Sequence, residues 1–454
     1  MDEEILFSLL KNKNIKELRP ILEVMNPVDI ATFLSDVDNV NLPIVFRLLP
    51  KDLAADTFVE MDTDMQQLLI SSFSDNELRI ILDELFIDDT VDIIEEMPAN
   101  VVKRILNQSD AASRKTINEI LQYPEDSAGS LMTIEFVTLR KNMTVRQAFD
   151  TIRRTGVDKE TIYTCYVTDN KKYLQGIISV KTLLLNNYET LISDIMETNI
   201  IHIDTHTDKE EVARQFSKYS FLAMPVVDKE GRLVGIITVD DALDVIKDEA
   251  TEDIAKLAGL TPADKPYLKT NVWNIWLNRV PWLLVLMIGA TFTGIIITHY
   301  ESTLAISITL TACIPMIMGS GGNASSQASV TVIRGIALGE IKFKDISKIL
   351  WKELRVSLLL GATLAVACFI KLMAVDQLFR IPNGSMISLV VCITMFLTII
   401  VSKIVGGVLP LFAKALKLDP AVVANPFITT IVDALSLIIY CNVALLLLKP
   451  LGIL

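Results

Sequence analysis

One ionisable side chain interrupts the last long apolar stretch of the chain. Asp433 lies near the middle of residues 421–448 and is the only charged residue in that stretch. A carboxylate at the centre of a bilayer costs about 3 kcal/mol or more, so it persists where water, a partner or a cation compensates it. Asp433 is therefore either a hydrogen-bonded group inside a helix bundle or part of a cation site on a transport path.

Oxygen-bearing side chains recur with Asp433 at helical spacing. Asn425, Thr429 and Asp433 are four residues apart, so they share one face of a helix. Amide, hydroxyl and carboxylate oxygens suit a hard cation such as Mg²⁺, which usually keeps several of its waters. Asp419 lies two residues before this stretch, and the candidate metal-binding residues here are Asp419, Asn425 and Asp433.

A second set of carboxylates lies just before the apolar part of the chain. Residues 244–262 are predicted to form a charged helix. Asp241, Asp244, Asp248 and Glu252 recur along one face of it and of the residues just before it, at intervals of three or four, and Glu249 and Asp253 flank that face. Like charges at this spacing repel, and a bound cation reverses that effect. The alternative is a solvated acidic face. The candidate cation ligands are Asp241, Asp244, Glu249, Glu252 and Asp253.

The charge of the chain is divided between its two ends. Residues 1–270 hold 48 Asp and Glu against 29 Lys and Arg, whereas residues 271–454 hold 7 against 13. An acidic, water-soluble part joined to an apolar, slightly basic part disfavours nucleic-acid binding. The N-terminus lacks the basic flank of a signal peptide, so we expect the first 270 residues to lie in the cytoplasm. The five cysteines show no disulfide or zinc spacing, and no nucleophile–base constellation or Walker sequence predicts an enzyme.

The soluble part contains two kinds of pattern. Residues 1–125 show apolar residues at helical spacing, punctuated by Asn26-Pro27, Leu49-Pro50 and Met97-Pro98, which predicts stacked short helices. Residues 167–184 align without gaps to residues 226–243, with eight of eighteen positions identical. Each copy reads as strand, turn, strand and helix start. Paired units of this kind resemble CBS domains (cystathionine-β-synthase modules), for which adenine nucleotides such as ATP are candidate ligands; the alternative is a purely structural repeat.

The apolar part divides into five segments long enough to cross a bilayer, at about 278–298, 304–333, 354–375, 386–412 and 421–448. The most basic loop follows the second segment and falls on the cytoplasmic side when the N-terminus is inside. We therefore expect a multi-pass protein of the cell membrane.

Motifs along nearly the whole chain resemble the MgtE family of magnesium transporters and channels. They are YPEDSAGSLMT (123–133), the CBS pair, DEATEDI (248–254), GSGGN to VIRGIALGEI (319–341) and DPAVVANPFITTIVD (419–433). The resemblance implies a multi-domain membrane protein and a homodimer with its pore at the dimer axis. Its expected parts are an all-α superhelical N-domain (1–128), an α/β tandem CBS pair (129–192 and 193–243), a connecting plug helix (244–270) and a five-helix transmembrane domain (271–454).

The resemblance also assigns roles to residues. It makes Asp433 the pore carboxylate and places Asn425 near the inner end of the pore. It implies further sensor carboxylates, and it predicts uptake of Mg²⁺ down its electrochemical gradient, closed by cytosolic Mg²⁺. These sensor residues are Asp56, Asp88 and Asp92 in the N-domain and Asp208 and Glu210 in the second CBS unit.

The sequence departs from the family pattern at two positions, and two functions other than a Mg²⁺-selective channel remain open. Ser325 and Ser436 stand where the family usually or often has glycine, which would add bulk and a donor near the pore. A channel of broader selectivity, admitting Co²⁺ or Mn²⁺, is one alternative. A membrane-bound nucleotide sensor is the other, and adenine nucleotide binding without ion flux would favour it.

Overall fold

The computed structural model describes residues 3–157, 159–262, 267–268, 270–305, 308–379, 384–422 and 425–451, without the side chains of 3, 375–379, 384, 425 and 451. The chain divides into two compact units, residues 1–246 and residues 247–454. Separate hydrophobic cores stabilise them, since no buried cluster joins residues of both units within the described ranges.

Short helices form the first part of the first unit, ten of them within residues 3–120, as the apolar spacing predicts. Asn26 caps α3 by accepting a hydrogen bond from the Val28 amide at 3.0 Å, and Pro50 and Pro98 precede α5 and α9. Proline is tolerated at a helix start because the first amides have no partner in the helix. The helices are α1 (Glu3–Lys11), α2 (Ile15–Leu22), α3 (Pro27–Ser35), α4 (Leu42–Phe46), α5 (Lys51–Val59), α6 (Thr63–Ser72), α7 (Asp75–Leu82), α8 (Ile87–Glu96), α9 (Ala99–Gln108) and α10 (Ala111–Ile120).

The duplicated residues form two sheets of the same design. In each, the first strand is parallel to the second and the second is antiparallel to the third. Val167 pairs with Gly176 in one sheet, and Val226 pairs with Gly235 in the other, so the aligned residues have the same register. The elements are β1 (Phe136–Leu139), α11 (Val145–Thr155), β2 (Thr161–Thr168), β3 (Leu174–Ser179), α12 (Val180–Leu185) and α13 (Ile192–Ile195), then β4 (Ile203–Asp204), α14 (Lys209–Tyr219), β5 (Ala223–Val227) and β6 (Leu233–Thr238).

The two sheets contact each other through equivalent turns. Tyr173 bridges to Arg232, and the Leu233 amide donates to the Lys172 carbonyl at 2.9 Å. Tyr166 and Ile236, both fully buried, belong to a small core shared by the two copies. Neither copy buries this surface alone, which is why the units occur as a pair.

Helix α15 (Val239–Leu257) begins and ends five residues before the charged helix predicted at 244–262. The expected boundary between the second CBS unit and the connecting helix, at residue 243, falls inside one continuous helix. No proline or glycine interrupts residues 239–257, so the helix of the CBS unit runs on. It ends where Gly259 adopts a φ of +68°, a left-handed conformation that glycine accepts without strain.

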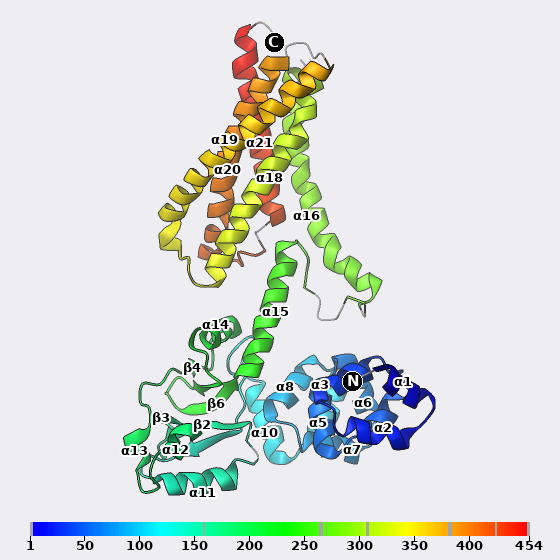
Figure 1. Cartoon of the computed structure of the whole chain (residues 1–454), viewed down its shortest axis with the longest axis vertical. Helices are drawn as coiled ribbons and strands as arrows, with labels where there is room; N and C mark the ends of the chain where they lie inside the picture. The colour runs from blue at the N-terminus through cyan, green and yellow to red at the C-terminus, as the bar shows by residue number, and fades with distance from the viewer. Residues whose placement is uncertain are drawn as a thin grey trace. The chain divides into compact units, whose positions relative to one another are not determined.

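The described residues of the second unit include the long helices α16, α18, α19, α20 and α21, drawn in Figure 1. Helices α18, α19, α20 and α21 run side by side, and α18 contacts both α20 and α21. The elements are α16 (Val272–His299), α17 (Glu301–Leu304), α18 (Ile308–Ala337), the 3₁₀ turn η1 (Phe343–Asp345), α19 (Ile346–Phe379), α20 (Gly384–Ala415), α21 (Asn425–Leu448) and the 3₁₀ turn η2 (Lys449–Leu451).

Four of the described helices are long and apolar enough to cross a membrane, at residues 272–299, 343–374, 385–415 and 426–448. They correspond to four of the five predicted segments. The remaining segment forms α18, which is long enough but carries the sequence GSGGNASSQAS at its centre. Its small residues Gly321, Gly322 and Ser325 are buried, so α18 packs against other helices instead of presenting an apolar surface.

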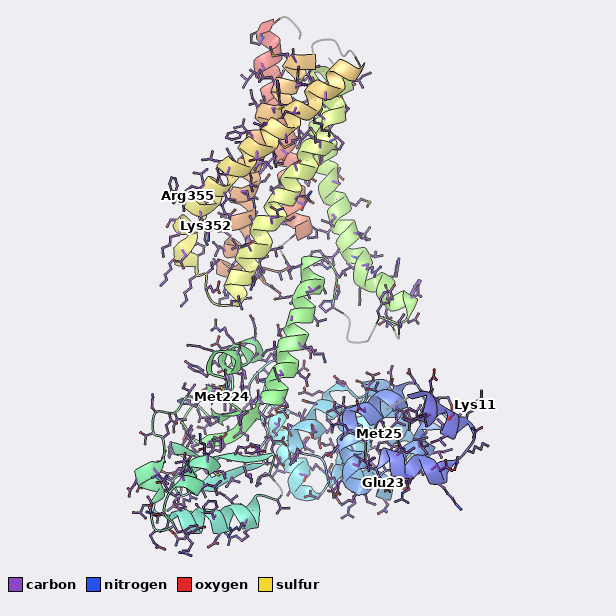
Figure 2. All side chains as sticks on the ribbon, viewed as in Figure 1. Lys11, Glu23, Met25, Met224, Lys352 and Arg355 are labelled. Carbon is purple, nitrogen blue, oxygen red and sulfur yellow. The ribbon has the colours of Figure 1, made fainter. Side chains whose placement is uncertain are left out.

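Basic residues gather where α19 begins. Lys352 and Arg355 lie on the first turns of α19 (Figure 2). The Arg355 guanidinium lies over the Trp351 ring, with Cζ 5.6 Å from the ring centroid. Cationic and aromatic residues of this kind are typical of the end of a spanning helix at the membrane surface, so this arrangement fits the predicted cytoplasmic loop.

Candidate functional site

Asp433 faces the glycine-rich centre of α18. The position that a Cβ atom of Gly322 would occupy lies 2.9 Å from Thr429 Cγ2 and 3.8 Å from Asp433 Oδ1. The predicted common face of Thr429 and Asp433 is therefore confirmed, and that face packs on the backbone of α18. Glycine is needed at 322 because any side chain there would meet Thr429.

The carboxylate of Asp433 is half-buried, and no hydrogen bond or ion pair within the described ranges holds it. Asn425 begins α21, but its side chain lies outside the described part of the chain, and its predicted role stays a prediction.

The two serines that depart from the family pattern point into the bundle. Ser325 and Ser436 are 0% and 1% exposed. Ser325 donates to the Gly322 carbonyl at 2.8 Å, and Ser436 donates to the Val432 carbonyl at 2.6 Å. Each hydroxyl therefore donates within its own helix, and the effect expected of these serines near the pore stays a prediction.

A cluster of carboxylates lies in the first unit, where α8 meets the start of α15. Burial, then the charges of Asp89 and Asp241, raises the pKa of Asp88 to about 9. Burial followed by the charge of Asp241 raises the pKa of Asp89 to about 7. Asp92 is exposed when its whole side chain and backbone are considered, but its carboxylate is partly removed from solvent. This desolvation, followed by the charge of Asp241, also raises the pKa of Asp92. Asp241 thus lies opposite all three aspartates of α8.

Two members of this carboxylate cluster, Asp89 and Glu160, are not predicted from the sequence. Glu160 directly precedes β2 in the first CBS unit, and burial, then Asp89 and Asp240, raises its pKa to about 7. Asp89 could have been predicted as a member of the cluster because it is next to Asp88. No motif near Glu160 in the sequence indicates that Glu160 belongs to the cluster. The cluster therefore draws carboxylates from the N-domain and from both CBS units.

Some oxygens of this cluster cap a helix, and at least one has no hydrogen-bond partner. Asp241 accepts hydrogen bonds from the Thr238 hydroxyl at 2.6 Å and from its amide at 3.3 Å, so one of its oxygens caps α15. Asp88 is 8% exposed, and its Oδ1 is buried without a hydrogen-bond partner. No three acidic, histidine or cysteine side chains in the described residues are close enough to hold an ion directly.

The remaining predicted sensor residues have less specific surroundings. Asp56 is exposed, and partial burial, then Asp52 and Glu84, raises its pKa. Asp208 caps α14 by accepting from the Glu210 amide at 2.9 Å, which gives Asp208 a structural role. Asp244 and Glu249 lie on α15 beyond Asp241.

The C-terminal end of α15 carries an ion-pair network within the second unit. The Lys256 ammonium donates to Asp419 Oδ2 at 2.7 Å and lies 2.6 Å from Glu252 Oε1. Burial would lower the pKa of Lys256, but the bonds to Asp419 and Glu252 outweigh it and raise that pKa, so the ammonium stays charged. Asp419, predicted as a metal ligand, is thus bonded to a protein cation.

Models of three protein families match the chain in consecutive order. They are the MgtE intracellular N domain at residues 1–126, the CBS domain at 128–187 and 192–248, and the divalent cation transporter MgtE at 314–443. The chain is 36% identical to the magnesium transporter MgtE of Thermus thermophilus over 99% of its length and 100% of the relative's. It is 31% identical to that of Bacillus subtilis over 96% and 95%.

Two solved structures resemble the first half of the chain. One is the cytosolic domain of the Mg²⁺ channel MgtE in complex with ATP, with a TM-score of 0.51 and 37% identity, covering 53% of this chain and 98% of the other. The second is the soluble part of a magnesium transporter, with a TM-score of 0.51 and 31% identity, covering 55% and 98%.

The fold, the matched models and the apolar helices define a divalent cation transporter of the membrane with a soluble, CBS-containing cytosolic part. The chain belongs to the MgtE family.

Proposed function

We propose that this chain is a Mg²⁺ uptake channel driven by the electrochemical gradient. The observation that carries the proposal is the half-buried carboxylate of Asp433, which lies against the glycine-rich centre of α18 and has no bonding partner among the residues that the structure describes. In a homodimer, two such carboxylates would accept hydrogen bonds from the waters of one divalent ion. The membrane potential contributes about 4.6 kcal/mol for a divalent ion per 100 mV, so no ATP hydrolysis is needed.

The carboxylate cluster of the first unit supports regulation by cytosolic Mg²⁺. Asp88, Asp89, Asp241 and Glu160 come from different modules and repel one another when ionised. A divalent cation among them would offset that repulsion and draw α8 towards α15. Since α15 continues without a break to Leu257, the state of the cluster can reach the channel through one helix.

The role of ATP stays a prediction. A related cytosolic domain was solved with ATP, and this chain has the CBS pair. We infer that ATP is a ligand of the pair and assign it no contact residue.

Growth of a bacterium that lacks its own Mg²⁺ uptake tests the proposal. The wild-type chain should restore growth in low Mg²⁺, whereas Asp433→Ala, produced at the same level in the membrane, should not. Equal rescue by both would overturn the assignment of Asp433. If cells that produce the wild-type chain also take up Co²⁺ or Mn²⁺, that result would support a channel of broader selectivity instead.

Neutralising four carboxylates tests the regulation. Asp241, Asp244, Glu249 and Glu252 are replaced together by alanine, and flux is measured as internal Mg²⁺ rises. Flux should remain but lose most of its inhibition by internal Mg²⁺. Unchanged inhibition would contradict the sensor.

A further inference from the structure

Four cysteines gather in the second unit, one on each of α18, α19, α20 and α21. All four are buried and belong to one hydrophobic core together with Tyr440. Their spacing in the sequence indicates no common site, because only the packing of the helices brings them together. They are Cys313, Cys368, Cys392 and Cys441.

The packing of α19 against α20 brings Cys368 level with Cys392. Only residues 380–383 join the two helices, so neighbours of this kind run antiparallel. Their register is fixed where the Cβ position of Gly407 lies 3.2 Å from Glu353 Cγ. From that contact, Cys368 lies fifteen residues forward on α19 and Cys392 lies fifteen residues back on α20. The Cys392 thiol accordingly donates a hydrogen bond to the sulfur of Cys368.

Further sulfur atoms surround this thiol pair. The Lys371 ammonium, one turn beyond Cys368, donates to Met316 Sδ of α18 at 3.6 Å. Cys313, one turn before Met316, interacts with Cys392. Three helices therefore contribute sulfur to one neighbourhood. No three acidic, histidine or cysteine side chains in the described part of the chain can share one ion, so a site here has two thiols as its direct ligands.

Two thiols from facing helices suit a soft metal ion. Thiolate sulfur selects ions such as Cu⁺, whereas Mg²⁺ takes oxygen ligands in octahedral geometry. Cu⁺ and its redox-inert analogue Ag⁺ accept two sulfur ligands on opposite sides of the ion. If one thiol gives its proton to water, the resulting thiolate offsets the charge of the ion. The loaded pair then carries no net charge, which apolar surroundings favour.

We propose that Cys368 and Cys392 form a binding site for a soft monovalent metal ion of the Cu⁺ class. Two metal–sulfur bonds form, one S–H bond breaks, its proton leaves to solvent, and no electron is transferred. The ion ties α19 to α20. Cys368 lies in the last third of α19, which runs outward on the predicted topology, so the site faces the outer side of the membrane. The inference does not depend on the proposed function.

Titration with Ag⁺ in competition with a chromophoric chelator tests the site on the full-length protein in detergent. Wild type should bind one ion per chain most tightly and release one proton for it. Cys368→Ser and Cys392→Ser should each weaken this binding by more than about tenfold, since loss of even an outer-shell partner costs about that much.

Two cysteine variants serve as matched controls. Cys165→Ser alters the core of the first CBS unit, and Cys441→Ser alters another cysteine of the membrane helices. Both should keep the tight site. Sulfur-bearing side chains also serve as simple core fillers, and in that case the pair variants would bind Ag⁺ like wild type. That result, or an equal loss in the controls, overturns the proposal.

A measurement on the wild-type chain avoids any effect of substitution on folding. X-ray absorption at the copper edge of the Cu⁺-loaded protein should show sulfur neighbours alone, and millimolar MgCl₂ should not displace the ion. Oxygen or nitrogen neighbours, or displacement by Mg²⁺, would overturn the assignment to the thiol pair.

Discussion

At the scale of single residues, Asp88 has its charge state set by the fold. Its pKa is about 9 in the folded chain, against an ordinary value of 3.8. Below about pH 4 the group is protonated in both states, so its effect is constant. Between about pH 4 and 9 only the folded state keeps the proton, so stability falls as the pH rises, by at most about 1.4 kcal/mol per pH unit.

Asp88→Asn should remove this slope. We expect the variant of segment 1–246, which corresponds to related domains solved as separate chains, to melt at a higher temperature than wild type at pH 8 without Mg²⁺. The gain should be about 1 kcal/mol or more and should shrink towards pH 5. Thermal denaturation followed by circular dichroism measures it. A variant that is less stable at both pH values would show that Asp88 is not held protonated.

At the scale of the elements, the close contact of α18 with α21 positions Asp433. Gly322→Ala would place a methyl group 2.9 Å from Thr429 Cγ2, so the helices must separate. We expect flux in liposomes to fall several-fold. Gly319→Ala is the control, because its Cβ position on the same helix meets nothing within 4 Å. Equal flux in both variants would mean that this packing does not set the position of Asp433.

Helix α15 is the second element with a testable role. Ala250 lies near its middle, and Ala250→Pro removes a helical hydrogen bond at a cost of about 3 kcal/mol. Flux should persist while its inhibition by internal Mg²⁺ weakens, because the cluster around Asp241 is then uncoupled from the channel. Ala250→Ser should keep the inhibition. Full inhibition in the proline variant would argue against transmission through α15.

At the scale of the whole molecule, the uneven charge predicts a Mg²⁺-dependent stability. Residues 1–270 carry a net charge of −19 from 48 acidic and 29 basic residues. A ligand that binds only the folded state stabilises it by mass action. Millimolar MgCl₂ should raise the melting temperature of segment 1–246 more than NaCl at equal ionic strength. An equal effect of both salts would indicate screening without a bound ion.

The sequence predicted the repeated architecture because that information is local. Aligned residues of the duplication, such as Val167 and Val226, have identical strand register. Helix spacing also placed Thr429 and Asp433 on one face. The start of α15 was missed, because nothing in a helix-forming sequence distinguishes its CBS part from its connecting part.

The sites depend on contacts that no local pattern encodes. Glu160 joins the carboxylate cluster only because β2 lies near α8, and Asp419 meets Lys256 across 163 residues. The pairing of Lys256 with Glu252 is the exception, since spacing of four on a helix could have revealed it. The orientation of Ser325 and Ser436 into the bundle likewise depends on tertiary packing.

Mg²⁺ flux through purified protein in liposomes tests the central claim most directly. Wild type, Asp433→Asn and Asp433→Glu are compared at equal incorporation under an inside-negative potential. Removing the charge in Asp433→Asn should reduce Mg²⁺ entry at least tenfold, and Asp433→Glu should keep part of it. Mg²⁺ entry through Asp433→Asn at the wild-type rate would contradict the account.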